Sequence, residues 1–214
     1  MANADAAAGA APPAPPARNV LAVFAHPWPH SFTGSILHSA VRGLRAAGHR
    51  VEIADLYAEG FDPVFRHADY AQFDHEPMPD DVRREQARVE RSDALLFVFP
   101  VWWWSFPAML KGWFDRVWSE GWAYAFTPER SRGLLGHRPV LMLCVAGSRY
   151  VTYERYGYDQ AMRTQIDIGV MSYAGLSDVR SQFFYEVDDD LASHEEHLRL
   201  AYDLGRAFLA PEPA

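Results

Sequence analysis

Short apolar segments alternate with longer amphipathic segments along most of this chain, and this order limits the possible folds. Strands are predicted over residues 19–25, 51–55, 94–99, 138–145 and 179–184. Helices are predicted over residues 32–47, 79–91, 107–119, 160–173 and 190–209. Strands separated by helices pair in parallel. The sequence therefore predicts an α/β fold, a three-layer, doubly wound, parallel five-stranded sheet.

The chain has 214 residues, which fits a single domain, predicted here over residues 18–210. Residues 1–17 are rich in Ala and Pro. They lack the basic start that precedes the apolar core of a signal peptide, so we expect a disordered leader or a misassigned start.

Charge and cysteine content narrow the class of protein. A formal net charge of −8 disfavours nucleic acid as a partner, and there is no apolar run long enough for membrane insertion. The single Cys144 excludes an internal disulfide and a multi-cysteine metal site, which favours a cytoplasmic protein. We expect Cys144 to be a buried core residue rather than a nucleophile.

The loop between the predicted strand 94–99 and helix 107–119 contains three consecutive tryptophans, Trp102, Trp103 and Trp104. Any one of them fits a core position. Successive side chains in an extended loop diverge, so at least one is expected to face a ligand or another subunit. An aromatic junction between a strand and a helix is typical of a site that binds a flat ring.

Ligands of open parallel sheets collect at the carboxyl ends of the strands, which here are followed by loops 26–32, 100–106 and 146–153. The first loop has no GxGxxG motif, but Ser31 and Thr33 lie where a helix begins. Backbone N–H groups, hydroxyls and His26 could converge there on a phosphate, and Ser31 could equally be only an N-cap.

The spacing of histidines in the sequence gives no good evidence for a metal site. His26 and His30 have the spacing of a metal pair on a helix, but the intervening prolines prevent that helix, so no metal site is expected. His194 and His197 are expected to belong to a solvated helix start.

Three segments together resemble a known family: AHPWPHSFTGS (25–35), ADLYAEGFDPVF (54–65) and FPVWWWSFPAMLKGWFDRVWSEGWAYAF (99–126). They are similar to the flavodoxin-like NAD(P)H:quinone oxidoreductases, which include mammalian DT-diaphorase and ancillary subunits of bacterial potassium efflux systems. The resemblance covers most of residues 19–210. It implies a flavodoxin-like sheet with strand order 2-1-3-4-5.

The resemblance also implies roles for individual residues. The flavin-binding positions are His26, Ser31, Phe32, Thr33, Pro100, Val101, Trp102, Trp103, Trp104, Ala146, Gly147 and Ser148. Thr33 replaces the usual Asn of the family, and 145–148 replaces its usual Thr-Thr-Gly-Gly. Tyr153 matches a catalytic Tyr, and Tyr158 lies near the position of a catalytic His, so both are expected to supply or orient a proton.

The implied activity is transfer of a hydride from NAD(P)H through bound flavin, FAD or alternatively FMN, to a quinone or similar acceptor in a ping-pong reaction. Two alternatives stay open: a regulatory flavoprotein subunit of a potassium efflux system, and a tailoring reductase of secondary metabolism. A homodimer is expected, because the family is dimeric and the aromatic run continues through Trp113, Trp118, Trp122, Tyr124 and Phe126.

Overall fold

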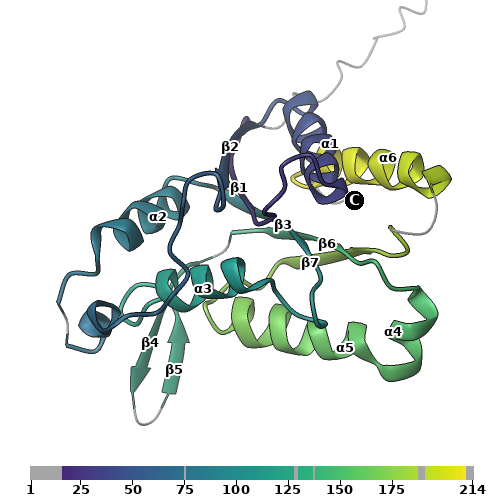
Figure 1. Cartoon of the computed structure of the whole chain (residues 1–214). Helices are drawn as coiled ribbons and strands as arrows, with labels where there is room; N and C mark the ends of the chain where they lie inside the picture. The colour runs from purple at the N-terminus through teal and green to yellow at the C-terminus, as the bar shows by residue number, and fades with distance from the viewer. Residues whose placement is uncertain (1–15, 75, 128–129, 137, 188–190, 211–214) are drawn as a thin grey trace, which may run out of the picture.

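The computed structural model describes residues 16–74, 76–127, 130–136, 138–187 and 191–210, so residues 1–15 of the predicted leader lie outside it. Within the described ranges, parallel strands form a five-stranded sheet in the order β2-β1-β3-β6-β7 (Figure 1). The strands are β1 (Asn19–Phe24), β2 (Arg50–Asp55), β3 (Ala94–Pro100), β6 (Val140–Val145) and β7 (Val179–Phe184). The predicted topology is confirmed, since this is order 2-1-3-4-5 when the strands of this sheet are numbered along the chain.

Helices cover both faces of the sheet, which gives the three predicted layers (Figure 1). One face is covered by α1 (Phe32–Ala46) and α6 (Leu191–Ala207). The other is covered by α2 (Asp80–Glu90), α3 (Ala108–Val117), α4 (Tyr150–Tyr156), α5 (Tyr158–Arg163) and the π-helix η2 (Thr164–Ser172). Every residue of β3 is buried, as expected for a strand between two helical layers.

The helices α1 and α6 pack closely along the first face. A Cβ atom on Gly205 would lie 2.1 Å from the Ala40 carbonyl oxygen, so only glycine permits this separation. The Ser39 hydroxyl donates to the Leu198 carbonyl oxygen at 2.7 Å. This contact joins the middles of the two helices, and near their starts the rings of Phe32 and His194 lie 4.0 Å apart between centroids. The start of α6 therefore lies beside the start of α1.

The sequence patterns missed three elements. The short antiparallel hairpin of β4 (Tyr124–Thr127) and β5 (Arg130–Gly133) has mostly exposed, polar residues in β5, which hide its strand character. The 3-10 helix η1 (His67–Gln72) lies in the segment expected to be irregular. The third is α4, whose C-cap is Gly157 with φ of 66°. The predicted helix 160–173 is present as α5 continued by η2.

The helix α3 is anchored by a buried arginine. The Arg116 guanidinium, 4% exposed, bonds at 3.1 Å to both carboxylate oxygens of the fully buried Asp69 in η1. It also donates to Asp81 at 2.6 Å and to the Asp62 carbonyl oxygen at 2.8 Å. One side chain thus joins α2, α3, η1 and the segment before η1.

Neighbouring residues of the same helix complete its packing. A Cβ on Gly112 would lie 2.1 Å from the Pro63 carbonyl oxygen, so glycine allows the segment before η1 to lie against α3. Trp113 is fully buried and its indole N–H donates to Glu85 at 2.9 Å. Trp113 and Trp118 therefore belong to the core, so these two members of the aromatic run do not support the expected dimer.

Burial decides the role of Cys144. Cys144 is 1% exposed, and burial raises the pKa of its thiol, which confirms a core role. None of the helices in the described ranges has the length and apolar character needed to cross a membrane.

We predict that Arg116→Ala lowers the free energy of unfolding by about 3–5 kcal/mol, because it leaves the buried Asp69 carboxylate without a counter-charge. Lys111→Ala is the matched control, since Lys111 pairs with Asp115 on the exposed side of the same helix and should cost less than about 1 kcal/mol. Urea denaturation of both variants measures the difference. Equal losses would show that Arg116 is not the anchor.

Candidate functional site

A cavity of about 690 Å³ lies at the carboxyl ends of β1, β3 and β6. It combines the loop after each of these strands with a residue that follows β7. The lining residues are His26, Trp28, Ser31, Phe32, Thr33, Pro100, Val101, Trp102, Val145, Gly147, Ser148 and Val187. Nine of the predicted binding residues are in this set, so the structure brings most of the predicted site together.

The start of α1 forms one end of the cavity. The Ser31 hydroxyl accepts from the Gly34 N–H at 3.1 Å, so Ser31 is the N-cap. The first-turn N–H groups of Phe32 and Thr33 donate to no acceptor in the described part of the chain. These two donors, together with the positive end of the helix dipole, suit an anionic group such as a phosphate.

His26 lines the same cavity and has one ring nitrogen available for a ligand. Its Nδ1 lies 3.0 Å from both the backbone nitrogen and the carbonyl oxygen of Trp28, which leaves Nε2 for a ligand. Burial lowers the pKa of His26, although its hydrogen bond with the Trp28 backbone acts in the opposite direction. The ring is therefore neutral at pH 7, and Nε2 donates when Nδ1 accepts the Trp28 N–H.

The three tryptophans occupy a tight turn. Trp102 and Ser105 exchange backbone hydrogen bonds of 3.3 and 3.2 Å, and the two residues between them have positive φ angles of 52° and 53°. Bulky residues rarely adopt this left-handed conformation, which costs on the order of 1–3 kcal/mol at each position. Such strain is concentrated at functional sites.

The turn directs the three rings to different surroundings. Trp102 is 42% exposed and lines the cavity, whereas Trp103 is 88% exposed and does not. Trp104 is half-buried and packs on Tyr158, with ring centroids 4.1 Å apart. The expectation that not all three lie in the core is confirmed.

The two predicted catalytic tyrosines have different environments. Tyr158 contacts Trp104 directly, whereas Tyr153 is 2% exposed and meets Tyr158 edge-on at 6.1 Å. Burial raises the pKa of Tyr153 to about 12, so its hydroxyl is protonated at neutral pH. Neither tyrosine lines the cavity.

A fourth segment, after β7, was missed by the sequence analysis. Val187 lines the cavity, and its N–H lies 3.4 Å from the Ala146 carbonyl oxygen. Ala146 itself is fully buried behind the cavity, and its N–H donates to Phe184 at 2.7 Å. Ligands of parallel sheets collect at the carboxyl ends of the strands, so Val187 could have been predicted by also considering the segment after the last strand.

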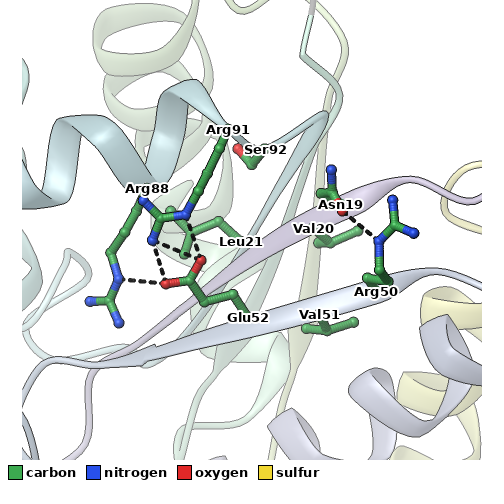
Figure 2. Close-up of a pocket in the computed structure, with 9 residues that line it drawn as sticks. All are labelled: Asn19, Val20, Leu21, Arg50, Val51, Glu52, Arg88, Arg91 and Ser92. Carbon is green, nitrogen blue, oxygen red and sulfur yellow. Dashed lines mark hydrogen bonds and ion pairs between the residues drawn. The ribbon is translucent and has the colours of Figure 1, made fainter.

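A second cavity, of about 330 Å³, lies at the opposite, amino end of the strands (Figure 2). Arg88 and Arg91 both reach Glu52 there, at 2.8 Å, and Arg50 donates to the Asn19 side chain at the same distance. Arg88 also pairs with Glu59 and Glu85, so three carboxylates balance the three arginines here. The cavity at the carboxyl ends of the strands is therefore the better candidate for an anionic ligand. No group of three or more His, Cys, Asp or Glu residues in the described ranges could hold a metal.

Comparison with known proteins identifies the family of this chain. A family model described as a flavodoxin-like fold matches residues 18–203. An uncharacterized NAD(P)H oxidoreductase of Haemophilus influenzae is 31% identical over 170 residues, which cover 79% of this chain and 84% of that protein. The ribosyldihydronicotinamide dehydrogenase [quinone] of Pongo abelii is 30% identical over 199 residues, covering 84% and 85%.

Solved structures show the same relationship. The NAD(P)H:quinone oxidoreductase from Methanothermobacter marburgensis has a TM-score of 0.81 and 34% identity, covering 89% of this chain and 98% of its own. An FMN-dependent NADH-azoreductase from Bacillus anthracis, solved in complex with FMN, has a TM-score of 0.71 and 15% identity, covering 91% and 100%, and shows the fold alone. The chain belongs to the flavodoxin-like family, among relatives named as NAD(P)H and quinone oxidoreductases.

Proposed function

We propose that this chain is a flavin-dependent NAD(P)H oxidoreductase that reduces a quinone or similar acceptor. The cavity carries the proposal, because free helix N–H groups and His26 lie at one end and an aromatic turn adjoins it. This layout suits a ligand with a phosphate and a flat ring. The names of the relatives supply the two substrates. The single cysteine supports a cytoplasmic location.

The proposed cofactor is FAD, with FMN as the alternative. Trp28, 61% exposed, lines the cavity near His26 and offers an indole face on which an adenine could stack. The azoreductase that shares the fold was solved with FMN. Denaturing the protein and identifying the released flavin by chromatography distinguishes the two.

When bound, a flavin supplies the hydride transfer between NAD(P)H and the acceptor. The chain would bind its phosphate through His26 and the first-turn N–H groups of Phe32 and Thr33. Residues 100–104 and 146–148 would orient its ring, with backbone N–H groups at the ring's polar edge replacing the hydroxyls of the usual family loop. Ala146 is fully buried behind the loop after β6, so it would support Gly147 and Ser148 rather than touch the flavin.

We assign the proton-handling role first to Tyr158, whose ring packs on Trp104. Tyr153 would support the Tyr158 ring from the core and keep its own hydroxyl protonated. Steady-state NADH and NADPH oxidation with a panel of quinones tests the overall proposal. Quinone-dependent turnover by the isolated protein supports an enzyme, whereas negligible turnover would favour the regulatory subunit.

A homodimer is part of the proposal. Exposed aromatic residues gather around a smaller cavity of about 300 Å³ between η1, α3, β4 and η2. This aromatic surface consists of Phe65, Tyr70, Phe73 and Tyr173, the half-buried Tyr124, and Phe126, which follows Tyr124 by two residues in β4 and so lies on the same face of that strand. Large exposed aromatic patches mark interfaces, and a second copy seated there would shelter rings that one copy leaves in water.

We predict that Phe126→Glu converts the protein from a dimer to a monomer, because Phe126 is 63% exposed and a carboxylate there would have to be desolvated in the interface. Light scattering should give twice 24.2 kDa for the wild type and 24.2 kDa for the variant. Leu200→Glu on α6, away from this surface, is the control and should stay dimeric. A wild-type mass of 24.2 kDa would contradict the prediction.

Replacing His26 with Ala should weaken flavin binding on the order of tenfold or more, because a hydrogen bond to a charged phosphate contributes roughly 1.5–3 kcal/mol. His30→Ala is the control, since His30 is exposed in the same loop and does not line the cavity. Fluorescence titration of the flavin-free protein gives both dissociation constants. An unchanged value for His26→Ala would remove His26 from the site.

Single Ala replacements in the tryptophan turn should have separable effects. Trp102→Ala should lower flavin affinity, and Trp103→Ala should raise KM for the acceptor while the melting temperature stays near wild type, because Trp103 is almost fully exposed. Trp104→Ala should lower the melting temperature, because it removes the packing on Tyr158. If all three variants lose only stability, with wild-type kinetics per flavin-loaded molecule, the turn is structural.

A further inference from the structure

Two histidines lie near the start of α6, as the sequence predicted, but they pack against a wall of the 690 Å³ cavity and are not fully solvated. The ring centroids of His194 and His197 are 4.0 and 6.2 Å from that of Phe32, and both side chains are only partly exposed. His194 is stacked on Phe32 with an interplanar angle of 22°. Phe32 is a lining residue of the cavity, whereas neither histidine is.

His194 also contacts a second wall of the cavity. Its Nε2 lies 2.7 Å from the carbonyl oxygen of Val187. A carbonyl oxygen only accepts, so Nε2 carries the proton of this hydrogen bond. One side chain therefore holds both Phe32, in the loop after β1, and Val187, in the segment after β7.

The contacts of His194 with Phe32 and Val187 lie at the end of the cavity that suits a phosphate. The Phe32 N–H is one of the two free first-turn donors, and the stacked ring holds the residue that carries this donor against α6. Val187 is in turn hydrogen-bonded to Ala146 in the loop after β6. Displacing His194 would loosen two walls of the cavity together.

We propose that His194 is a positioning residue for the cofactor, which holds the phosphate end of the cavity in its binding shape through Phe32 and Val187. The proposal rests on the proposed function, because it takes a flavin as the ligand. It concerns the phosphate and not the ring, since both contacts of His194 lie at the helix-start end. Loss of His194 should therefore weaken a phosphorylated flavin more than riboflavin, which has no phosphate.

The test compares FMN and riboflavin binding to flavin-free protein by fluorescence titration, in the wild type and in His194→Ala. We expect the Kd for FMN to rise on the order of tenfold and the Kd for riboflavin to change less than about twofold. Two partial variants separate the contacts. His194→Phe keeps a stacked ring without the hydrogen bond, and His194→Gln keeps a donor without the ring, so each should give an intermediate Kd for FMN.

Tyr202→Ala is the matched control, because Tyr202 is on the same helix and contacts Arg42 of α1 away from the cavity. It should lower the melting temperature without changing the ratio of the two dissociation constants. If His194→Ala does not fold, the Kd values of His194→Phe and His194→Gln for FMN and riboflavin test the proposal instead. Equal losses of FMN and riboflavin affinity, or an unchanged FMN affinity, would overturn the role of His194 alone. A wild-type protein that binds neither FMN nor FAD would overturn the proposed function as well.

Discussion

The buried ion pair between Arg116 and Asp69 is the contact on which the arrangement of the site depends. It lies between α3, η1 and α2, and its guanidinium donates to three residues on different segments, Asp69, Asp62 and Asp81. Because α3 begins directly after the tryptophan turn, this anchor fixes one end of the turn, and the buried strand β3 fixes the other. A turn with two bulky residues at positive φ can persist only between elements held in this way.

The aromatic residues from Trp102 to Trp118 contribute both to the core and to the candidate site, depending on whether each one is buried. Trp113 and Trp118 are in the core, where their rings pack together with Phe114. Trp102 and Trp103 lie before α3, where the core ends, and remain exposed. The candidate site thus lies where a strongly stabilised strand and helix meet, and its precision comes from the core beneath it.

Much of this was predictable because it depends on local pattern. The apolar run of β3, the cap at Ser31 and the alternation of strands with helices predict the parallel sheet and the loops that line the cavity. The strand order and the individual binding residues came from the family resemblance. The stacking of His194 on Phe32 was not predictable, because it arises from the packing of α6 on α1, between residues far apart in the sequence. The hairpin and α4 were missed because exposed short strands, and a seven-residue helix in which only Tyr153 is buried, lack a clear hydrophobic period.

The central claim is that the cavity at the carboxyl ends of β1, β3 and β6 holds a flavin that passes a hydride from NAD(P)H to a quinone. Anaerobic stopped-flow absorbance of the flavin-loaded protein tests it most directly. We predict that NADH or NADPH bleaches the flavin band, that a quinone restores it, and that both steps are at least as fast as steady-state turnover. A flavin that stays bound but is bleached by neither nucleotide would contradict the account.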